Sequence, residues 1–338
     1  MSSKTLRIRL LFAIALALSA VAIVVATASA TAPGNNGRIA FRRYFDAHQS
    51  WGAVFTIAAD GKGTRQITHP ARGIVDDQPD WAPDGSLIAF SRCCAPGSHL
   101  FVVAPNGSGL APVGPLCPSG ADETTCPDDA NASFSPDSKQ LAFTQAIGHV
   151  VENQIEHSAI AIMNRDGSGR RVIYEEDAPY SADLNSPVFS PDGKQLVFER
   201  ANSGVSTPAG KKAVFVVGID GSNPRRLTPW KENDGDNPDW SPNGKWILFH
   251  SHVDESTGVQ SQIFLIHPDG TGRRQVTRFS KGTHVLSSSF SPDGKSIVFS
   301  KGPNGGNIDV FTMRLDGSHV QRVTRSKLWD SAPDWGPR

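Results

Sequence analysis

One recurring phrase constrains the fold of this chain more than any other feature: an aromatic residue, Ser or Ala, Pro, Asp or Asn, and then Gly or Ser. In every complete copy a Phe stands nine positions after the anchoring aromatic residue and closes a short apolar run. Pro restricts φ and Asp or Gly accepts turn conformations, so each copy predicts a β-hairpin. The complete copies begin at Trp81, Phe134, Phe189, Trp240 and Phe290, and a truncated copy begins at Trp335.

A second phrase accompanies these hairpins: an apolar run, an Asx-Gly turn and a last short strand. Asn-Gly and Asp-Gly between apolar runs are strong hairpin signals. Each repeat therefore predicts four antiparallel strands within about 45 to 55 residues, the size of one propeller blade. The turns are Asp60-Gly61, Asn106-Gly107, Asp166-Gly167, Asp220-Gly221, Asp269-Gly270 and Asp316-Gly317.

Proline indicates which strand of a repeat lies at the sheet edge. Pro79, Pro187, Pro238 and Pro333 each stand two residues before an anchoring aromatic residue. Because Pro cannot donate a hydrogen bond to a neighbouring strand, it is largely confined to edge strands. We therefore expect the first strand of each repeat to face a central channel.

The two ends of the chain carry complementary fragments of the repeat. Residues 37–41 match a second strand that has no first strand before it, and residues 331–335 match a first strand that has no second strand after it. Pairing these fragments closes a ring and removes the exposed edges that a linear solenoid would keep. The sequence predicts an all-β, six-bladed β-propeller with four antiparallel strands per blade, closed by pairing of the N- and C-terminal strands.

The phrase aromatic-Ser-Pro-Asp-Gly followed by Lys-x-Ile-x-Phe, as in residues 290–299, resembles the Pro-Asp repeat of the TolB-like β-propeller family, a WD40-like repeat. The resemblance covers residues 36–338 and implies the propeller fold. The family includes protein-docking scaffolds, domains that regulate attached hydrolases and a few propellers with their own chemistry. The resemblance therefore leaves the function open.

The N-terminus predicts export from the cytosol. Basic residues at positions 4, 7 and 9 precede an apolar run over residues 10–26, and Ala28-Ser29-Ala30 has the form that signal peptidase cleaves. We interpret residues 1–30 as a Sec signal peptide and residues 31–338 as a single propeller domain. An uncleaved anchor is the alternative, because the run is nearly long enough to span a membrane. Cleavage yields a secreted or periplasmic protein of the cell envelope with no membrane span.

Composition and motifs exclude several function classes. Without residues 1–30 the chain has 30 basic and 33 acidic residues, a net charge of about −3, and no block of like charges that would favour a nucleic-acid partner. No Gly-x-Ser-x-Gly elbow, Walker loop or dinucleotide fingerprint occurs in the context that its chemistry requires. A monomer is expected.

The cysteines are concentrated in one part of the chain. Cys93, Cys94, Cys117 and Cys126 fall within 34 residues. In an exported protein this clustering predicts two disulfides, and the spacing leaves the pairing open. A zinc site would be expected to show a Cys-x-x-Cys or Cys/His pattern, which these cysteines lack.

The loops of the predicted propeller fall on two faces. Turns between first and second strands and between third and fourth strands are short and uniform, whereas the connections on the opposite face vary in length and sequence. Variable loops on a rigid scaffold commonly carry binding, so we expect a protein, peptide or glycan partner on the variable face. The candidate ligand-binding residues are Asp77, Asn185, Asp236, Asp330, His284, Trp230 and Trp329.

Acidic side chains near the predicted channel mouth suggest a calcium site at Asp77 and Asp236. Like charges that are brought together repel, and an oxygen-rich site can relieve this by binding a hard cation. Two alternatives remain: each Asp caps its own loop, or the negative mouth attracts a basic peptide. For Trp230 and Trp329 the alternative to ligand stacking is packing of each loop onto its own blade.

Two functions from different classes are expected. The first is a non-catalytic scaffold that binds a protein, a peptide or an envelope glycan. The second is a propeller enzyme, a lyase or hydrolase that uses carboxylates and histidines at the channel mouth. No residue is assigned as catalytic, and calcium is the one cofactor suggested.

Overall fold

The computed structural model describes residues 34–93, 97–116, 128–151, 154–176, 182–202, 211–253, 260–303 and 305–338. These residues form 24 β-strands and one short 3-10 helix, η1 (Trp230–Glu232). The prediction of an all-β protein is confirmed.

Four of the five sheets contain four antiparallel strands each, and we call these sheets units 3 to 6. Unit 3 consists of β8 (Asp128–Phe134), β9 (Gln140–Val151), β10 (Gln154–Asn164) and β11 (Arg171–Glu175). Unit 4 consists of β12 (Ala182–Phe189), β13 (Gln195–Asn202), β14 (Lys212–Gly218) and β15 (Arg225–Arg226). Unit 5 consists of β16 (Asp234–Trp240), β17 (Ile247–Val253), β18 (Gln260–Ile266) and β19 (Arg274–Gln275). Unit 6 consists of β20 (Thr283–Phe290), β21 (Ser296–Pro303), β22 (Asp309–Arg314) and β23 (Gln321–Arg322).

The fifth sheet has eight strands and joins two antiparallel groups, units 1 and 2. Unit 1 consists of β24 (Asp330–Pro337), β1 (Asn36–Tyr44), β2 (Gly52–Ala58) and β3 (Arg65–Gln66). Unit 2 consists of β4 (Val75–Trp81), β5 (Ile88–Cys93), β6 (His99–Val103) and β7 (Ala111–Pro112).

A parallel bridge between Gly52 of β2 and Val75 of β4 connects units 1 and 2. The expectation that every sheet is purely antiparallel is therefore wrong at this point. The short strand β3 pairs only with Phe55 and Thr56, which leaves the start of β2 open. The backbone N–H of Gly52 donates a hydrogen bond to the backbone oxygen of Ile74, next to the start of β4, at 3.2 Å.

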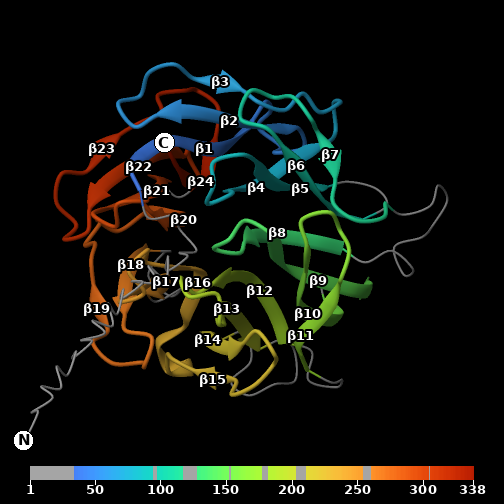
Figure 1. Ribbon diagram of the computed structural model, residues 1–338. Coiled ribbons are helices and arrows are strands. Elements are labelled where there is room, and N and C mark those ends of the chain that lie inside the picture. Colours follow the sequence, from blue (N-terminus) through green and yellow to red (C-terminus); the bar gives the residue numbers. More distant parts are fainter. Residues whose placement is uncertain are drawn as a thin grey trace, which may run out of the picture.

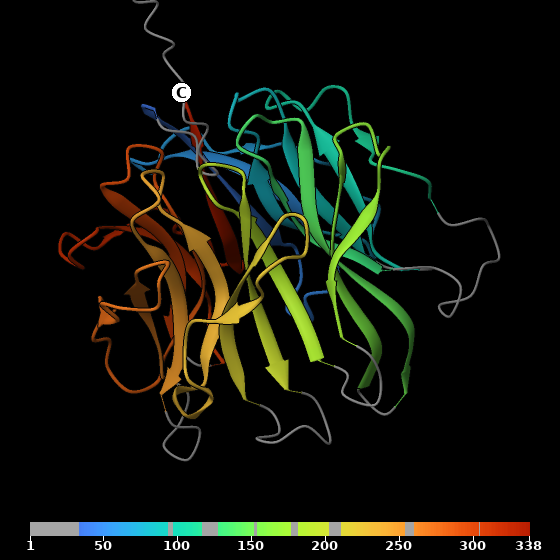
Figure 2. The same cartoon turned by 60° about the horizontal axis from the view of Figure 1, so that its bottom comes forward.

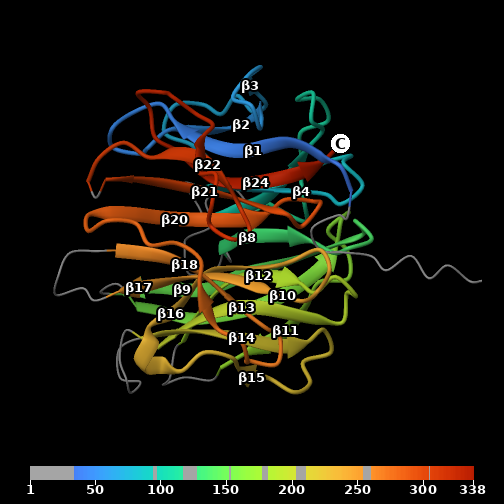
Figure 3. The same ribbon diagram turned by 90° about the vertical axis from the view of Figure 1, so that its left-hand side faces the viewer.

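The units lie around a common centre (Figure 1). The first strands β24, β4, β8, β12, β16 and β20 lie nearest the centre, and the short fourth strands lie at the periphery. Seen from the side, β3 and β15 lie at opposite margins of the molecule (Figure 3). The proline-based assignment of the first strand to the inner edge is confirmed.

The two ends of the described chain meet in unit 1. Strands β1 and β24 pair antiparallel, with Ile39 opposite Trp335, and Figure 2 shows the blue first strand beside the red last strand. The indole Nε1 of Trp335 donates a hydrogen bond to the backbone oxygen of Gly37 at 3.3 Å. The predicted pairing of the terminal strands is confirmed.

The hydrophobic core consists of separate clusters that each lie between consecutive units. Unit 6 packs on unit 1 through Val298 and Val310, which contact Phe41 and Trp335. The Phe that follows each anchoring aromatic residue is fully buried in these clusters, which explains its constant spacing. These residues are Phe90, Phe143, Phe198, Phe249 and Phe299.

The Ser-Pro-Asp-Gly phrase forms a self-contained turn. In unit 6 the hydroxyl of Ser291 donates to Asp293 Oδ1 at 2.6 Å and accepts the N–H of Ser296 at 2.9 Å. Gly294 adopts φ 66°, a left-handed conformation that Gly reaches without a Cβ clash. The recurrence of the phrase therefore reflects turn architecture.

Candidate functional site

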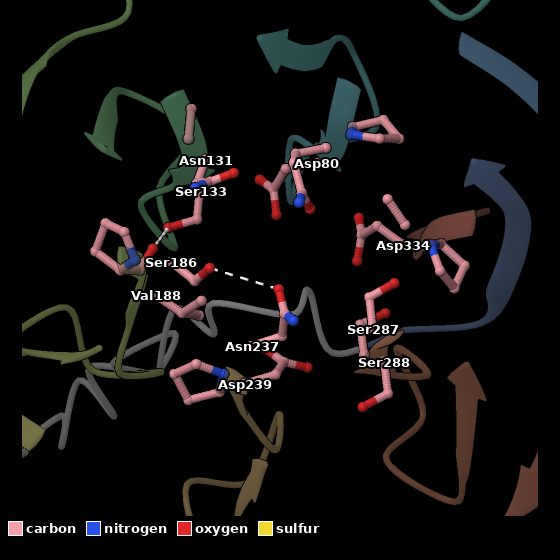
Figure 4. A pocket seen from close by; sticks show the side chains of 18 residues that line it. Asp80, Asn131, Ser133, Ser186, Val188, Asn237, Asp239, Ser287, Ser288 and Asp334 are labelled. Atoms are coloured by element: carbon pink, nitrogen blue, oxygen red, sulfur yellow. Dashed lines mark hydrogen bonds between the residues drawn. The ribbon is translucent and has the colours of Figure 1, made fainter. Parts of the chain in front are cut away.

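The centre of the molecule contains an open cavity of about 90 Å³. All six first strands contribute to its wall, and each contributes the three residues that precede its anchoring aromatic residue. Figure 4 shows these side chains converging on a shared space. The lining residues are 78–80, 131–133, 186–188, 237–239, 287–289 and 332–334.

A repeated backbone irregularity turns these residues toward the centre. The pairing of each first strand with its second strand shifts register there, as between Asp77 and Asp80. Five residues at the bulge have a left-handed φ of 47° to 53°, although none is Gly. A β-bulge re-aims a side chain in this way, at a cost of order 1 kcal/mol or more for each left-handed residue. The left-handed residues are Gln78, Asn131, Ser186, Asn237 and Ala332.

Three carboxylates line the cavity, and we call Asp80, Asp239 and Asp334 the cavity carboxylates. Each accepts a backbone N–H from the first strand of the next unit: Asp80 from Phe134 at 2.8 Å, Asp239 from Phe290 at 2.7 Å, and Asp334 from Trp81 at 2.8 Å. All three line the cavity; Asp239 is buried, and Asp80 and Asp334 are half-buried. These hydrogen bonds link neighbouring units at the inner edge.

The surroundings of the cavity carboxylates favour their protonated forms. Burial raises the pKa of Asp239 to about 8 and that of Asp334 to about 6. Burial also raises the pKa of Asp80 well above its ordinary value, and the nearby charges of Asp334 and Asp239 add to this. No Lys or Arg in the described ranges offsets the charge of any of the three. Near neutral pH, Asp239 is mostly protonated and Asp334 mostly ionised.

Amide and hydroxyl groups complete the cavity wall. Asn237 Nδ2 donates to the backbone oxygen of Leu286 at 2.8 Å, and Ser133 Oγ donates to the backbone oxygen of Pro187 at 2.6 Å. Ser186 Oγ donates to Asn237 Oδ1 at 3.5 Å (Figure 4). The wall therefore offers both donors and acceptors between units.

The acidic residues at the strand starts are neutralised by arginines. The carboxylate of Asp330 accepts two bonds from Arg43, at 2.6 and 2.7 Å. A guanidinium therefore lies against four of the acidic residues at the strand starts, and the negative channel mouth stays a prediction. We call Asp76, Asp129, Asp234 and Asp330 the strand-start carboxylates, and their partners are Arg92, Arg170, Arg273 and Arg43.

The two residues proposed to bind calcium lie in different units, and each has a cationic partner. Asp77 pairs with Arg42. Asp236 pairs with Lys212, whose ammonium also lies 2.8 Å from Glu199. In the part of the chain that the structure describes, no group of three or more His, Cys, Asp or Glu is arranged to hold a metal ion. The calcium site stays a prediction, and no group of potential ligands among the described residues supports it.

The other predicted ligand-binding residues contact the protein itself or stand apart from the cavity. The ring of Trp230 lies 5.8 Å from the ring of Phe215, and Trp329 packs edge-on against Tyr44 at 6.4 Å. These contacts agree with the packing alternative for both Trp residues. Asn185 Oδ1 accepts the backbone N–H of Ser186 at 2.9 Å, and His284 lies half-buried near the start of β20.

None of the seven predicted residues lines the central cavity. The sequence did contain a signal for the cavity carboxylates, since Pro-Asp-Trp recurs at Trp81, Trp240 and Trp335, whereas Asp is absent before the anchoring Phe residues. The bulge moves the inward position one to three residues along the strand from the predicted one. Ligand binding by the predicted residues stays a prediction.

Comparison with known proteins identifies the repeat. A family model described as the TolB β-propeller domain matches residues 132–338, more than half of the chain. The chain belongs to this family.

Individual relatives share parts of this TolB-family propeller. Tol-Pal system protein TolB of Geobacter sulfurreducens is 38% identical over 77 residues, which are 23% of this chain and 17% of that protein. Dipeptidyl-peptidase 5 of Porphyromonas endodontalis is 32% identical over 111 residues, which are 33% of this chain and 15% of that protein. The chain therefore spans a small share of the length of these curated relatives.

A solved structure shares the fold over most of the propeller. The crystal structure of TolB from Acinetobacter baumannii superposes with a TM-score of 0.68 at 19% identity, and the match covers 89% of this chain and 67% of that chain. At this identity the likeness concerns the fold alone.

Two further expectations involve residues that the structure does not describe. Cys94, Cys117 and Cys126 lie outside the described residues, and within the described part no cysteine is free. The two disulfides stay a prediction. The signal peptide also lies outside the described residues, and none of the described helices is long and apolar enough to cross a membrane.

Proposed function

We propose that this TolB-family propeller is a non-catalytic binding scaffold whose central cavity receives a cationic side chain from an extended segment of a protein partner. The observation behind this proposal is the contrast in charge pairing. The strand-start carboxylates each face an Arg, whereas the cavity carboxylates face each other and have no cationic partner among the described residues. A cation from outside would complete the pairing that the chain leaves open.

The size of the cavity narrows the class of partner. Pockets for small organic ligands usually measure roughly 300 to 1,000 Å³, and this cavity measures about 90 Å³. A space of that size suits a few waters or the end of one long side chain. We therefore favour a peptide bearing Lys or Arg over an envelope glycan at this site.

The name of one relative supports the proposal of a protein partner. The relative from Geobacter sulfurreducens is, by its name, a protein of the Tol-Pal system. For the present chain we carry over only the expectation that it works with another protein.

The test is calorimetric titration of the exported, purified protein with Ala-rich hexapeptides that carry one central Lys, Arg or norleucine. We expect a cationic peptide to bind at least about tenfold more tightly than the norleucine peptide, a difference of about 1.4 kcal/mol. Binding should be tighter at pH 8 than at pH 6, because the pKa values of about 8 for Asp239 and about 6 for Asp334 leave more protons to be displaced at the lower pH.

Two matched double variants locate the binding site. Asp239→Asn with Asp334→Asn removes two of the three cavity carboxyl groups and should abolish the preference for cationic peptides. Asp60→Asn with Asp316→Asn removes two charges in exposed Asx-Gly turns and should leave the preference intact. Equal binding of all three peptides at both pH values would overturn the proposal.

A second candidate function is the propeller enzyme, and the pKa values of the cavity carboxylates are the observation that favours it. Two carboxyl groups whose pKa values lie on either side of neutrality are typical of a general acid and base. Incubation of the protein with mixed peptides and polysaccharides tests this function. Turnover that disappears in Asp239→Asn would favour the enzyme over the scaffold.

We further propose that the eight-stranded sheet counts as two blades, so that the ring has six.

We also propose that the chain is exported by its N-terminal signal, carries two disulfides and acts as a monomer outside the cytoplasm. Mass spectrometry of the exported protein tests cleavage after Ala30, and thiol titration of denatured, unreduced protein should find no free thiol.

A further inference from the structure

In every unit, one residue near the start of the first strand pairs with an equivalent residue on the second strand. We call the position of this cross-strand pair along the strands its level. The residue on the second strand stands two positions after the buried Phe of that strand. This repeated position allows the units to be compared directly. The pairs are Asp330 with Arg43, Asp76 with Arg92, Asp129 with Gln145, Leu184 with Arg200, Asp234 with Ser251, and Val285 with Lys301.

In units 1 to 5 a carboxylate and an Arg form a two-bonded ion pair at this level. In unit 2, Arg92 donates to Asp76 at 2.6 and 2.9 Å, and its guanidinium lies 4.6 Å from the ring centroid of Phe101. Where the cross-strand pair lacks the carboxylate or the Arg, a residue from elsewhere in the chain supplies the missing group. The other pairs are Asp330 with Arg43, Asp129 with Arg170, Glu176 with Arg200, and Asp234 with Arg273.

Unit 6 keeps the cation on its second strand but lacks the carboxylate on its first strand. Val285 stands where units 1 and 2 have Asp, and Lys301 stands where they have Arg. The Lys301 ammonium lies 4.1 Å from the ring centroid of Phe311. Within the described ranges Lys301 forms no ion pair, whereas an Arg at this level in each of units 1 to 5 forms one.

The acidic residue nearest to Lys301 is already engaged. Asp309 lies opposite Lys301 in the β21–β22 pairing. Its carboxylate accepts bonds from Arg322 and, at 3.0 Å, from Thr324 Oγ1. Burial lowers the pKa of Lys301, the charge of Arg322 lowers it further, and Asp309 offsets this only in part. The ammonium therefore lacks the compensation that its counterparts have.

A pocket of about 450 Å³ opens beside this ammonium. That volume lies within the range of roughly 300 to 1,000 Å³ that small-molecule sites occupy. Lys281, Lys301 and Arg322 line it together with a single acidic residue, Asp309, and the ring of Phe311. The pocket thus combines positive charge with an apolar wall.

We propose that this pocket, the Lys301 pocket, binds the carboxylate of a small acidic ligand in place of the carboxylate that units 1 to 5 supply from their own chain. The ligand carboxylate would lie against Lys301, and its body would contact Phe311. An acidic sugar and the C-terminus of a peptide both present this group. This site is separate from the central cavity and does not depend on its function.

Two pairs of probes test the proposal by calorimetric titration of the exported protein. One pair is D-glucuronate and neutral D-glucose, and the other is N-acetylglycine and N-acetylglycinamide. We expect at least one acid to bind at least tenfold more tightly than its neutral counterpart. Binding of glucuronate alone assigns an acidic sugar, binding of N-acetylglycine alone assigns a chain end, and binding of both assigns the carboxylate as the recognised group.

Substitutions in unit 6 test whether the acid binds at Lys301. Lys301→Met should weaken binding of the acid at least tenfold, whereas Lys295→Met, at an exposed turn of the same unit, should not change it. Val285→Asp supplies the carboxylate found in units 1 and 2 and should also abolish binding. Val285→Asn introduces a side chain of the same shape as Asp but without its charge, and should retain binding.

Melting temperatures identify any variant that fails to fold, and the Lys301→Met and Lys295→Met comparison remains decisive if both Val285 variants do so. Equal binding of acids and neutral counterparts by the wild-type protein would overturn the proposal. Unchanged acid binding by folded Lys301→Met would overturn it as well.

Discussion

The first strands carry two sets of carboxylates that the fold treats in opposite ways. The strand-start carboxylates are buried, and each faces a guanidinium. The cavity carboxylates lie a few residues further along the same strands, accept backbone N–H groups and have no described cationic partner. A charge whose partner belongs to the same chain serves the architecture, whereas a charge without one remains available for a ligand.

The largest expected effect comes from removing residues 331–338. This deletion takes away Asp334 of the cavity set and the strand that pairs with β1, and it exposes the cluster in which Trp335 is buried. We expect a loss of about 5 kcal/mol or more in the free energy of unfolding, comparable with the whole stability of an ordinary domain. Chemical denaturation measures this loss, and an unchanged midpoint would show that β24 is dispensable.

Breaking one strand-start pair should have the next largest effect. Asp76→Asn leaves the guanidinium of Arg92 without its charged partner, and we expect a loss of about 3 kcal/mol. The control Asp60→Asn, in an exposed turn, should change stability by less than about 0.5 kcal/mol. Adding Arg92→Met to Asp76→Asn should recover most of the loss. If Asp76→Asn and Asp60→Asn cost the same, the strand-start pairs are not structural.

The cavity set should respond to pH, with a smaller effect. The pKa of Asp239 is raised to about 8, so the folded state binds this proton more tightly than the unfolded state. Its contribution to stability is complete below about pH 4, the ordinary pKa of Asp, and is lost as the pH rises toward about 8. Because Asp239→Asn removes this titration, its stability relative to wild type should rise by about 2 kcal/mol between pH 5 and about pH 6.5.

Thermal unfolding of wild type, Asp239→Asn and the turn control Asp60→Asn at several pH values measures this difference. The turn control should follow the wild-type curve. Parallel curves for wild type and Asp239→Asn would mean that Asp239 titrates normally and that the cavity does not favour the protonated form.

The fold followed from the sequence more closely than the site did. The anchoring aromatic residues and the Asx-Gly turns marked the strands, and Pro at positions such as Pro79 and Pro238 marked the inner edge. The parallel bridge at Gly52 was missed, because it depends on where β3 ends over β2. For the site, Asp77 and Asp236 were chosen a few residues too early on their strands, since the bulge at Gln78 and Asn237 shifts the inward position.

The sequence by itself determined the hairpin turns, the buried Phe at constant spacing and the complementary ends. The turns and the Phe spacing depend on residues close together in the chain, so each repeat shows them again. The ends were recognisable because each is a fragment of that same repeat. The tertiary structure alone decided which charges meet, because Asp80, Asp239 and Asp334 belong to different units. Their convergence arises from how the units pack around the centre, which no local pattern specifies.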